Sequence, residues 1–568
     1  MLSRRDTIGF LLLALAVAAG LTLRVAGTLE KRTIEHDEAL SYLTAAGHIG
    51  TFRSTRIEGG EQVPAGRWVR ASAWKQFLQV DNTFCFKQIG KDTADHSNHP
   101  PLYFWLLHIW MRGFGTNLWT GLSLNFVIFL FTTFVLFKFA HYLLEDIFEA
   151  SFVVLLWALS PATIVTSLMA RMYDLLTLLT VLFAWLTSSY VYDQWKPERL
   201  NLLFLAIVTC AGALTHYQFL IIVLPAGVLL AVFKLARGNL KQLFLFMSSI
   251  ILGCLVAFIV HPNFYHSFHL NREYITPFDV QELPLRILVT AAGFGCFFTA
   301  ILQRITDGGL LLDPTHSTPL TFRGTLSVLS YNDLIIVLVV VLILLSIGWS
   351  TCFRLRAGGG LARFRPLWDS PAGGALWFGF CLAGAIIIQY LSFLLVKEAL
   401  RERYLSIVWP FVALGLVFVV RHTGRKVLFT TLLIALFLLL SVNEILHFRS
   451  VNTRLGDAQS IFEKSLTLVI DTFQEGKLLP VLWNIPDDKM VFIASQKYLL
   501  ENSGQWLGRL RDQSIIVSVL SYGATLGDQE RIVGMAATRC RVSALNVAIW
   551  RWTSLFQVDS CDKSDGHQ

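Results

Sequence analysis

Long uninterrupted runs of apolar residues constrain the fold of this 568-residue chain more than any other feature. A helix needs about 20 mostly apolar residues to cross the hydrocarbon core of a bilayer, and only helices or closed barrels satisfy their backbone polar groups there. Eleven runs meet this criterion: 8–27, 119–141, 151–169, 175–194, 200–216, 217–234, 243–262, 331–351, 375–396, 405–421 and 426–446. The sequence therefore predicts an all-α polytopic membrane protein with about eleven transmembrane helices.

Composition excludes several other classes of protein. Charged residues make up 15% of the chain, whereas soluble globular domains carry about 25%, which disfavours a soluble enzyme, a coiled coil and a disordered chain. Lysine and arginine exceed the acidic residues by eight. However, the chain has no basic tract interleaved with aromatic residues, no P-loop and no dinucleotide fingerprint, so no nucleic-acid partner is expected. The eight cysteines form no C-x-x-C pair, which argues against a zinc or redox motif.

Basic residues in the short connections between apolar runs indicate the orientation, because cytoplasmic loops of membrane proteins are enriched in lysine and arginine. Arg4 and Arg5 place the N-terminus in the cytoplasm. The first run is expected to remain as an uncleaved span, since its small residues lie inside the apolar stretch. With eleven spans, the later basic connections fall on the same side, near 196–199, 234–241, 354–365 and 421–426. The acidic connection 142–150 is the one that does not fit.

This count requires two weaker apolar stretches, 99–115 and 285–303, to lie in the membrane interface, which their polar residues favour. The chain then divides into a transmembrane domain, residues 1–446, and a soluble extracytoplasmic C-terminal domain, residues 447–568. The transmembrane domain includes two large external loops, 28–118 with interfacial helices and 263–330. A loop as long as 28–118 usually carries function.

The C-terminal segment is long enough for a small α/β domain. Strand-like runs cover 490–494 and 514–520, and a helix is expected at 546–556. Cys540 and Cys561 both lie in this segment, on the oxidising side of the membrane, so a disulfide between them is a hypothesis.

Five polar elements, far apart along the chain, fall on the same external face in this topology. They are Glu35-His36-Asp37-Glu38, Asn98-His99-Pro100-Pro101-Leu102-Tyr103, Ala170-Arg171-Met172-Tyr173-Asp174, His216-Tyr217 and Lys397-Glu398-Ala399-Leu400-Arg401-Glu402-Arg403-Tyr404. Each has an ordinary structural explanation: a solvated acidic cluster, a helix start, an arginine–aspartate pair on one helix face, or an interfacial anchor. Their convergence at one interface outweighs these separate explanations and favours group transfer from a lipid-linked phosphate.

The residue types in these elements suggest specific chemistry. Adjacent carboxylates raise each other's pKa, which suits Asp37 or Glu38 to proton abstraction. His99 lies close to the start of an expected interfacial helix, where backbone N–H groups favour an anion. Arg403 directly precedes an apolar span and is suited to bind a lipid phosphate through paired hydrogen bonds.

On these motifs the chain resembles the GT-C superfamily of integral-membrane glycosyltransferases, and within it glycosyltransferase family 39. That family includes protein O-mannosyltransferases and lipid A aminoarabinose transferases. The resemblance covers residues 1–446 and rests on DEALSYL (37–43), NHPPLYFWLLHIW (98–110), ARMYDLLTLL (170–179) and a late Arg-Tyr-Leu (403–405). It implies a GT-C fold and an inverting glycosyltransferase. The implied enzyme transfers a sugar from a polyprenyl-phosphate-linked donor to an acceptor hydroxyl on the extracytoplasmic face.

The resemblance also implies roles for individual residues. The catalytic candidates are Asp37 as general base, Glu38 beside it and Asp174 at the second acidic position. The candidates for binding the donor phosphate are Arg403, Tyr404, Arg401 and His99. The remaining substrate-binding candidates are Arg171, Tyr103, His216 and Tyr217. A Gly/Arg-rich insert around 59–70 and the segment 447–568 match no module of that family.

Several alternatives stay open at this point. No cofactor is firmly implied and no metal site is assigned, although a divalent metal is compatible with Asp37, Glu38 or His99 as ligands. The alternative functions are a secondary transporter and a lipid-linked glycan ligase or flippase. The acceptor is a glycan, a lipid or a protein hydroxyl. The expected location is the bacterial inner membrane, with the endoplasmic reticulum as the alternative, and the sequence does not identify the sugar or the oligomeric state.

Overall fold

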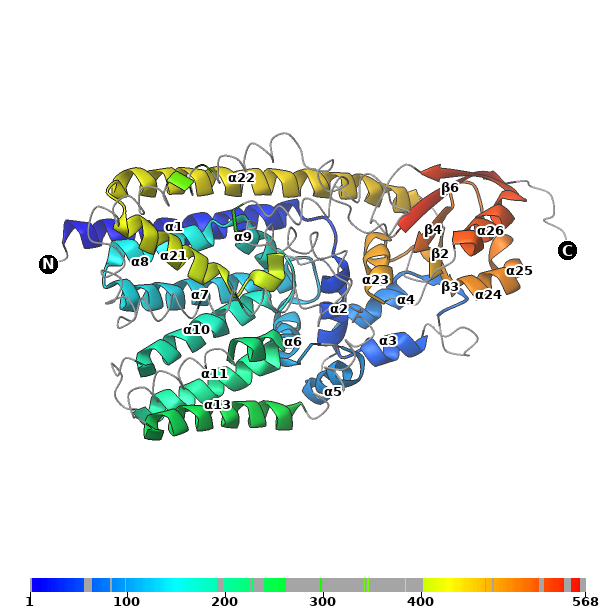
Figure 1. The fold of residues 1–568 in the computed structure, drawn as a ribbon. Helices are drawn as coiled ribbons and strands as arrows, with labels where there is room; N and C mark the ends of the chain where they lie inside the picture. The colour runs from blue at the N-terminus through cyan, green and yellow to red at the C-terminus, as the bar shows by residue number, and fades with distance from the viewer. Residues whose placement is uncertain are drawn as a thin grey trace, which may run out of the picture.

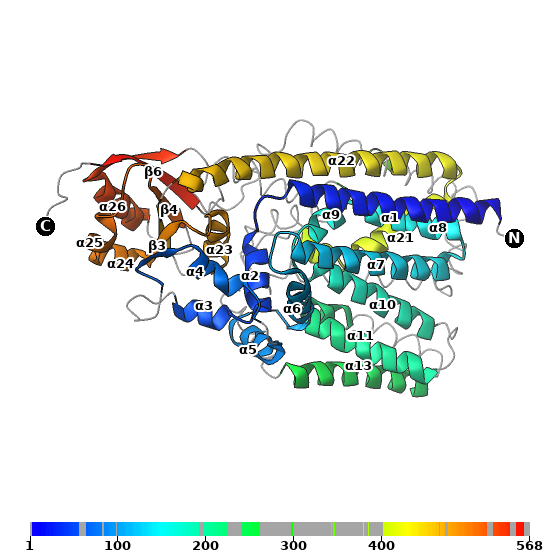
Figure 2. The ribbon, with the colours of Figure 1, turned by 180° about the vertical axis from the view of Figure 1, so that it is seen from behind.

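The computed structural model describes residues 3–55, 64–81, 84–97, 99–191, 198–223, 240–261, 402–464, 466–471, 475–519, 526–545 and 553–561, with a few single positions between them. Figures 1 and 2 show an elongated molecule in which the N-terminus lies at one end of a helical bundle. A compact α/β domain near the C-terminus lies beyond the other end of the bundle (Figure 1).

The bundle is built from α1 (Arg4–Glu30), α7 (Thr120–Leu144), α8 (Ile147–Ala158), α9 (Pro161–Ser167), α10 (Tyr173–Val191), α11 (Glu198–Thr215), α13 (Leu240–Val260), α21 (Trp409–His422) and α22 (Lys426–Gln459). Among the described residues, four helices are long and apolar enough to cross a membrane: α1, α7, α13 and the 426–453 part of α22. The predicted polytopic helical architecture is therefore confirmed. The count of eleven spans stays a prediction, because the runs 331–351 and 375–396 lie almost entirely outside the described residues.

The apolar run 151–169 forms two helices instead of one. Helices α8 and α9 pass the same length and hydropathy test as a pair, but they are bent by 61° at the break between them. Pro161 is the first residue of α9 and has no N–H to continue the hydrogen bonding of α8, while Ser160 before it is extended. The bend lets the chain turn at residues 168–172, where one of the predicted polar elements lies.

Two carboxylates of the acidic connection that did not fit the charge pattern are paired with arginines in the fold. This connection joins α7 to α8 at the end of the bundle where the N-terminus lies (Figure 1). Arg5 contacts Asp146 at 2.7 Å, and Arg421 at the end of α21 contacts Glu149 at 3.4 Å. The acidic turn and two basic elements therefore share one end of the bundle.

The segment 28–118 folds into short elements at the opposite end of the bundle: α2 (His36–Ala45), α3 (Ile49–Thr55), β1 (Trp68–Arg70), α4 (Ser72–Lys75), the 3-10 helix η1 (Gln76–Leu78), α5 (Phe86–His96) and α6 (Leu102–Phe114). In Figure 1, α2 and α6 run across the long axis of the bundle. With 13 residues, α6 spans only about 20 Å at 1.5 Å per residue, too short to cross a bilayer. This agrees with the expected interfacial position of 99–115.

The C-terminal domain contains one six-stranded sheet in the order β1-β3-β2-β4-β6-β5. The strands are β2 (Thr467–Asp471), β3 (Met490–Ser495), β4 (Ile515–Val519), β5 (Cys540–Leu545) and β6 (Thr553–Cys561) in addition to β1. The central strands β3, β2 and β4 are parallel, and the outer pairings are antiparallel. The 3-10 helix η6 (Ser460–Lys464) precedes β2. The helices between the strands are α23 (Glu475–Asn484), α24 (Gln496–Glu501), α25 (Ser503–Leu507) and α26 (Leu526–Ala537). The expected small α/β domain is therefore present.

Two details of this domain differ from the sequence-based expectations. The helix expected at 546–556 is wrong in its last four residues, because Thr553–Cys561 forms β6 and pairs with both β4 and β5. Its alternating apolar residues fit a half-buried strand. The insert around 59–70 contributes β1, which pairs with β3, so the sheet includes residues from the loop 28–118. The hypothesised disulfide is present: Cys540 and Cys561 are bonded and lie opposite each other on β5 and β6.

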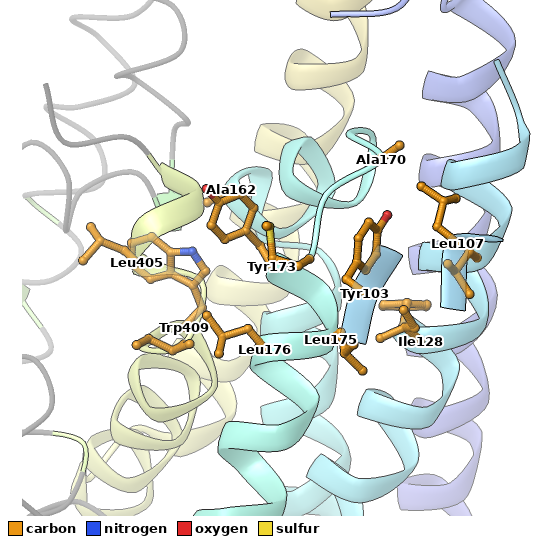
Figure 3. Packing of buried hydrophobic residues seen from close by; sticks show 14 of the residues in the cluster. Tyr103, Leu107, Ile128, Ala162, Ala170, Tyr173, Leu175, Leu176, Leu405 and Trp409 are labelled. Carbon is orange, nitrogen blue, oxygen red and sulfur yellow. The ribbon is translucent and has the colours of Figure 1, made fainter. Parts of the chain in front are cut away.

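The sheet is packed on both faces. One face, with Leu468, Phe492 and Ile516, packs against α24, α25 and α26 as a separate core. The other face packs against α23 and joins the main core, which continues into the helical bundle. Figure 3 shows part of that main core, with Tyr173 beside Trp409 and Tyr103 among α7 and α10 residues. The α/β domain is thereby continuous with the end of the bundle that carries α2.

Candidate active site

Helix α2 places two adjacent carboxylates in its first turn. Glu35 is the N-cap of this helix, His36 is its first residue, and Asp37 and Glu38 come next. Acidic residues are favoured there because the unpaired N–H groups give a helix N-terminus partial positive charge. Successive helical side chains are rotated by about 100°, so Asp37 and Glu38 face different surroundings.

The carboxylate of Asp37 is paired with an arginine from a distant part of the chain. Nη1 of Arg403, in the 3-10 helix η5 (Glu402–Leu405) just before α21, lies 2.5 Å from Oδ2 of Asp37. The side chain of Arg403 is 9% exposed and that of Asp37 is 17% exposed, so solvent screens the pair little. Nδ1 of His36 lies 3.2 Å from the second carboxylate oxygen.

This pairing determines the protonation of Asp37. Burial alone would raise the pKa of the carboxyl group, but Arg403 and then Arg171 lower it more strongly, so the pKa lies well below its ordinary value. The expectation that adjacency to Glu38 raises the pKa of Asp37 is therefore wrong, because each carboxylate has a cationic partner of its own. Asp37 is ionised at neutral pH.

Arg171 joins α2 to the segment that precedes α6. Its guanidinium donates to the backbone carbonyl of Asp37 at 3.2 Å, to Oγ of Ser41 at 3.2 Å and to Nε2 of His99 at 2.8 Å. Because arginine only donates, Nε2 of His99 accepts and the ring proton lies on Nδ1. Burial lowers the pKa of His99 well below its ordinary value, and Arg171 lowers it further, so this imidazole is neutral.

A row of rings continues from His99 along the same site. The ring centroids of His99 and His216 are 5.2 Å apart, those of His216 and Tyr173 are 5.8 Å apart, and those of Tyr173 and Tyr404 are 6.0 Å apart. Arg403 lies 5.2 Å from the centroid of Tyr404 and donates a 3.4 Å hydrogen bond to its hydroxyl. Burial lowers the pKa of His216 to about 3, so this ring is neutral too.

Three buried donors in this cluster have no hydrogen-bond partner among the residues that the structure describes. They are Nε of Arg403, Nε of Arg171 and Nδ1 of His99. Buried donors without partners are costly in a folded protein, and they usually mark a place where water or a ligand binds. Among the side chains of this cluster that the structure describes, Arg403 and Arg171 together exceed the charge of Asp37 by one, which favours an anionic ligand.

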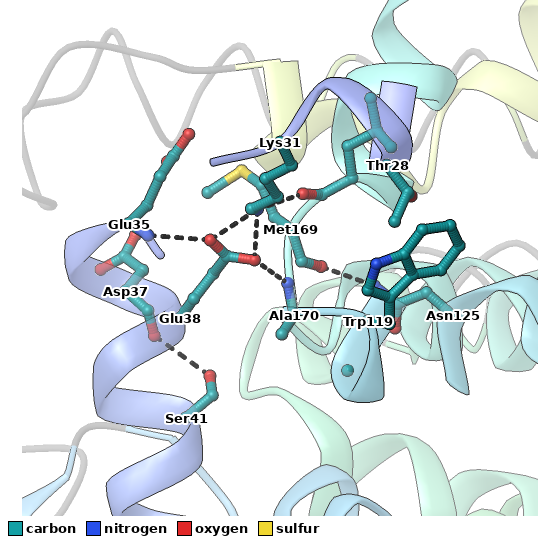
Figure 4. A network of polar contacts seen from close by, with 12 residues as sticks. Thr28, Lys31, Glu35, Asp37, Glu38, Ser41, Trp119, Asn125, Met169 and Ala170 are labelled. Carbon is teal, nitrogen blue, oxygen red and sulfur yellow. Dashed lines mark hydrogen bonds and ion pairs between the residues drawn. The ribbon is translucent and has the colours of Figure 1, made fainter. Parts of the chain in front are cut away.

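Glu38 lies outside this cluster in a network of its own, which Figure 4 shows. Nζ of Lys31 lies 2.7 Å from both carboxylate oxygens of Glu38 and 2.8 Å from the carbonyl oxygen of Leu168. The backbone N–H groups of Ala170 and Glu35 donate to Glu38 at 2.9 and 2.8 Å. Both Lys31 and Glu38 are buried.

Asp174 also has partners outside this cluster. It lies in the first turn of α10, is hydrogen-bonded by Ser167 and lies close to Arg24 of α1. Arg24 is fully buried and donates to Ser167 at 3.0 Å and to the carbonyl oxygen of Ala158 at 3.0 Å, at the bend between α8 and α9. Asp174 is thus placed with the polar groups that hold the bend.

The remaining candidates are distributed as follows. Tyr103 is buried and donates to Oδ1 of Asn125 at 3.2 Å, and Tyr217 contacts Nε2 of His261 at 3.2 Å, so both bond to structural partners. Arg401 lies outside the described residues. The structure thus brings together seven residues: Asp37, His99, Arg171, Tyr173, His216, Arg403 and Tyr404.

Sequence reasoning did not assign three residues that contact the candidates: Ser41, Tyr173 and Lys31. Ser41 follows Asp37 by one helical turn and could have been found from that spacing. Tyr173 lies inside a motif that was already identified. Lys31 carried no local signal, since it lies at the end of an apolar span and its partner is seven residues away.

No group of three histidine, cysteine, aspartate or glutamate side chains with metal-binding geometry is found in the part of the chain that the structure describes. The carboxylates suggested as ligands are occupied by cations, Asp37 by Arg403 and Glu38 by Lys31.

Comparisons with known proteins agree with the resemblance predicted from the motifs. Residues 98–266 match the family model described as dolichyl-phosphate-mannose-protein mannosyltransferase, which supports the expected relationship to GT-C glycosyltransferases. A comparison with curated proteins finds no match.

Two solved structures are similar over most of the chain at low identity. One is ArnT from Cupriavidus metallidurans bound to undecaprenyl phosphate, with 13% identity, coverage of 96% of this chain and 97% of that chain, and a TM-score of 0.47. The other is the oligosaccharyltransferase of Archaeoglobus fulgidus tethered with an acceptor peptide, with 12% identity, coverage of 94% and 69%, and a TM-score of 0.42.

Proposed function

We propose that this membrane protein, similar to GT-C glycosyltransferases, transfers a sugar from a polyprenyl-phosphate-linked donor to an acceptor hydroxyl. The transfer takes place on the extracytoplasmic face and inverts the anomeric carbon. The acceptor is a glycan, a lipid or a protein hydroxyl.

One observation supports this proposal most directly: the largely buried Asp37–Arg403 pair adjoins donors that have no partner among the described residues. The surplus of one positive charge matches the single negative charge of a phosphodiester, the linkage in a polyprenyl-phosphate sugar. Arginine is well suited to bind phosphate, because its fork of N–H groups pairs with two oxygens at once. The description of the matching family model also names a donor of this kind, dolichyl-phosphate-mannose.

The proposed reaction assigns one task to each group. Arg403, with Arg171 and the Nδ1–H of His99, binds the donor phosphate. The acceptor hydroxyl oxygen attacks the anomeric carbon from the side opposite the phosphate, and Asp37 takes the hydroxyl proton. The bond between that carbon and the phosphate oxygen breaks, and the lipid phosphate leaves as an anion. A positioned base contributes about 10²–10⁴-fold to such a step, and no general acid is needed because the leaving group is a stable anion.

The ion pair explains how Asp37 becomes a base only when the donor is present. In the free protein, Arg403 stabilises the carboxylate and lowers its proton affinity. A bound phosphate would share the guanidinium of Arg403, so the proton affinity of Asp37 would rise towards its ordinary value. Donor binding and activation of the base are thereby coupled through one arginine.

The first experiment measures the binding of undecaprenyl phosphate to the purified protein in nanodiscs, with undecaprenol as the matched lipid without phosphate. We expect the phosphate-bearing lipid to bind at least tenfold more tightly, and Arg403→Ala to remove most of that difference. Arg449→Ala, which changes an exposed arginine on α22, serves as the control and should bind like the parent protein. Equal affinity for both lipids would contradict the proposal.

The second experiment tests the base. Asp37→Asn should reduce transfer from a polyprenyl-phosphate sugar by at least 10²-fold while undecaprenyl phosphate still binds, because an amide cannot take the proton. Mass spectrometry of lipids that co-purify with the protein identifies the sugar to use. Near-normal turnover in a folded Asp37→Asn protein would exclude Asp37 as the base.

A further inference from the structure

We infer that the buried Lys31–Glu38 ion pair is a positioning device for the site, and that Glu38 is not one of its reacting groups. The pair fixes the position of the turn that carries Arg171 relative to α2, the helix that carries Asp37. This inference rests on the function proposed above and adds two positioning residues to it.

The contacts of the pair are complete. The Lys31 ammonium has three N–H donors, and three acceptors lie within 2.8 Å of it: both oxygens of Glu38 and the carbonyl oxygen of Leu168. The two oxygens of Glu38 also accept the backbone N–H groups of Ala170 and Glu35. No N–H of Lys31 is left for a phosphate. A carboxylate so occupied, and only 1% exposed, does not accept a substrate proton.

These contacts join three segments that are far apart in the sequence: the end of α1, the first turn of α2 and the turn 168–171. Figure 4 shows them meeting at Glu38. Arg171, one residue after Ala170, then reaches back to α2 through the Asp37 carbonyl and Ser41. The turn is therefore attached to α2 at two successive residues, and the second attachment carries a guanidinium of the proposed phosphate site.

Packing from the other side leaves the turn little freedom. A Cβ atom added at Gly121 of α7 would lie far inside contact distance of Cβ of Ala170 and 3.0 Å from the hydroxyl of Tyr42. Only a glycine at this position allows α7 to approach so closely. Because α7 holds the turn closely on one side, loss of the hydrogen bond from Ala170 to Glu38 would free the turn on the side that faces α2.

Removing one member or both members of the pair should have different consequences. A single substitution leaves an uncompensated buried charge, which is strongly destabilising, whereas neutralising both partners is commonly much milder. Lys31→Met/Glu38→Gln retains an amide oxygen that can accept the Ala170 N–H and contains no unpaired charge. This double variant keeps the question testable if Glu38→Ala does not fold.

The experiment has a structural readout and a functional readout. Hydrogen exchange of peptides that cover residues 166–174 is compared in the parent protein, Glu38→Ala and the double variant, and binding of undecaprenyl phosphate is measured on the same samples. We expect exchange in this segment to rise at least tenfold in Glu38→Ala and to be largely restored in the double variant. The affinity for undecaprenyl phosphate should likewise fall in Glu38→Ala and be largely restored in the double variant. Lys75→Met is the control, because it breaks another 2.7 Å ion pair between segments, with Asp487.

A double-mutant cycle separates positioning from direct chemistry. If Glu38 acts through Arg171, then Glu38→Ala should weaken binding of undecaprenyl phosphate by less than twofold when Arg171→Met is already present. The inference would be overturned if the losses of affinity caused by Glu38→Ala and Arg171→Met simply multiplied in the variant that carries both. It would also be overturned if hydrogen exchange at 166–174 were unchanged in a folded Glu38→Ala protein. If the parent protein binds undecaprenyl phosphate and undecaprenol equally, the proposed function fails, while the exchange experiment still decides whether the pair positions the turn.

Discussion

Asp37 and Glu38 are neighbours in the sequence, but the fold surrounds them differently. Asp37 is partly exposed, and a bound anion could draw away its partner Arg403, while His36 lies at its other oxygen. Glu38 is saturated by one ammonium and two backbone N–H groups. We therefore propose different roles for these two similar side chains: Asp37 is a reacting group, and Glu38 is a structural anchor.

The neutral imidazole of His216 predicts a particular dependence of stability on pH. Its pKa is about 3 in the folded protein, against an ordinary value of about 6.5 in the unfolded chain. Below pH 6.5 the unfolded chain therefore binds more protons than the folded one, so the free energy of unfolding falls as the pH decreases from 6.5 towards 3. Above pH 6.5 this contribution is constant.

The measurement is thermal unfolding of the purified protein at pH 5.0, 6.5 and 7.5. The parent protein should lose melting temperature between pH 6.5 and 5.0, and His216→Gln should lose less. His422→Gln is the control, since His422 is exposed at the end of α21. An identical pH dependence in the parent and in His216→Gln would show that His216 is not held neutral by burial.

At the scale of elements, α2 is supported from several directions. Its Tyr42 stacks on Trp483 of α23, with ring centroids 6.4 Å apart, and donates to the carbonyl oxygen of Asn117 before α7. Asn484 of α23 donates to Thr33, just before α2. The helix that presents Asp37 thus packs against both the bundle and the α/β domain, which makes this domain part of the support of the site.

The disulfide between β5 and β6 should stabilise the α/β domain without affecting the site. It closes a loop with a sequence separation of 21 residues, and constraining such a loop in the unfolded chain is worth about 3 kcal/mol. Strand β5 is at the edge of the sheet, separated by β6 and β4 from the strand β2. Cys540→Ser/Cys561→Ser should therefore lower the unfolding temperature and leave the affinity for undecaprenyl phosphate within twofold. A tenfold loss of affinity would show that the sheet edge is coupled to the site.

At the scale of the whole molecule, the two ends of the bundle hold different polar groups. One end holds the N-terminus and the ion pairs of Arg5 and Arg421 with the acidic turn. The other end holds α2, the helix that carries Asp37, and the α/β domain (Figure 2). The end with Arg4 and Arg5 at the N-terminus is the one expected in the cytoplasm.

This arrangement predicts the sidedness of the protein in its membrane. Single cysteines introduced as Ser3→Cys and Lys497→Cys, both at exposed positions, should react differently with a membrane-impermeant maleimide on right-side-out vesicles. Lys497→Cys should be labelled, Ser3→Cys should be labelled only after the membrane is permeabilised, and the parent protein measures the background of native cysteines. Labelling of Ser3→Cys on sealed vesicles would reverse the proposed orientation.

Sequence alone determined the class of the protein, and it named most of the residues that the structure brings together in the candidate site. Apolar run length is set by the thickness of the bilayer, so the membrane helices could be recognised without tertiary information. The polar motifs at the ends of these runs could be assigned to one face, because charge in the connections orients the spans. The bend at Pro161 and the strand at Thr553–Cys561 were missed, since both depend on neighbours that packing supplies.

Tertiary structure decided which partner each of those groups has. No local pattern distinguishes Asp37 from Glu38, because the difference lies in their partners. Asp37 pairs with Arg403 of η5, far away in the sequence, and Glu38 pairs with Lys31 at the end of α1. Electrostatic interactions depend on distance in space, and a pKa follows from the charges within a few ångströms and from burial. Neither quantity can be read from spacing along the chain, so the pairing of each carboxylate emerged only from the fold.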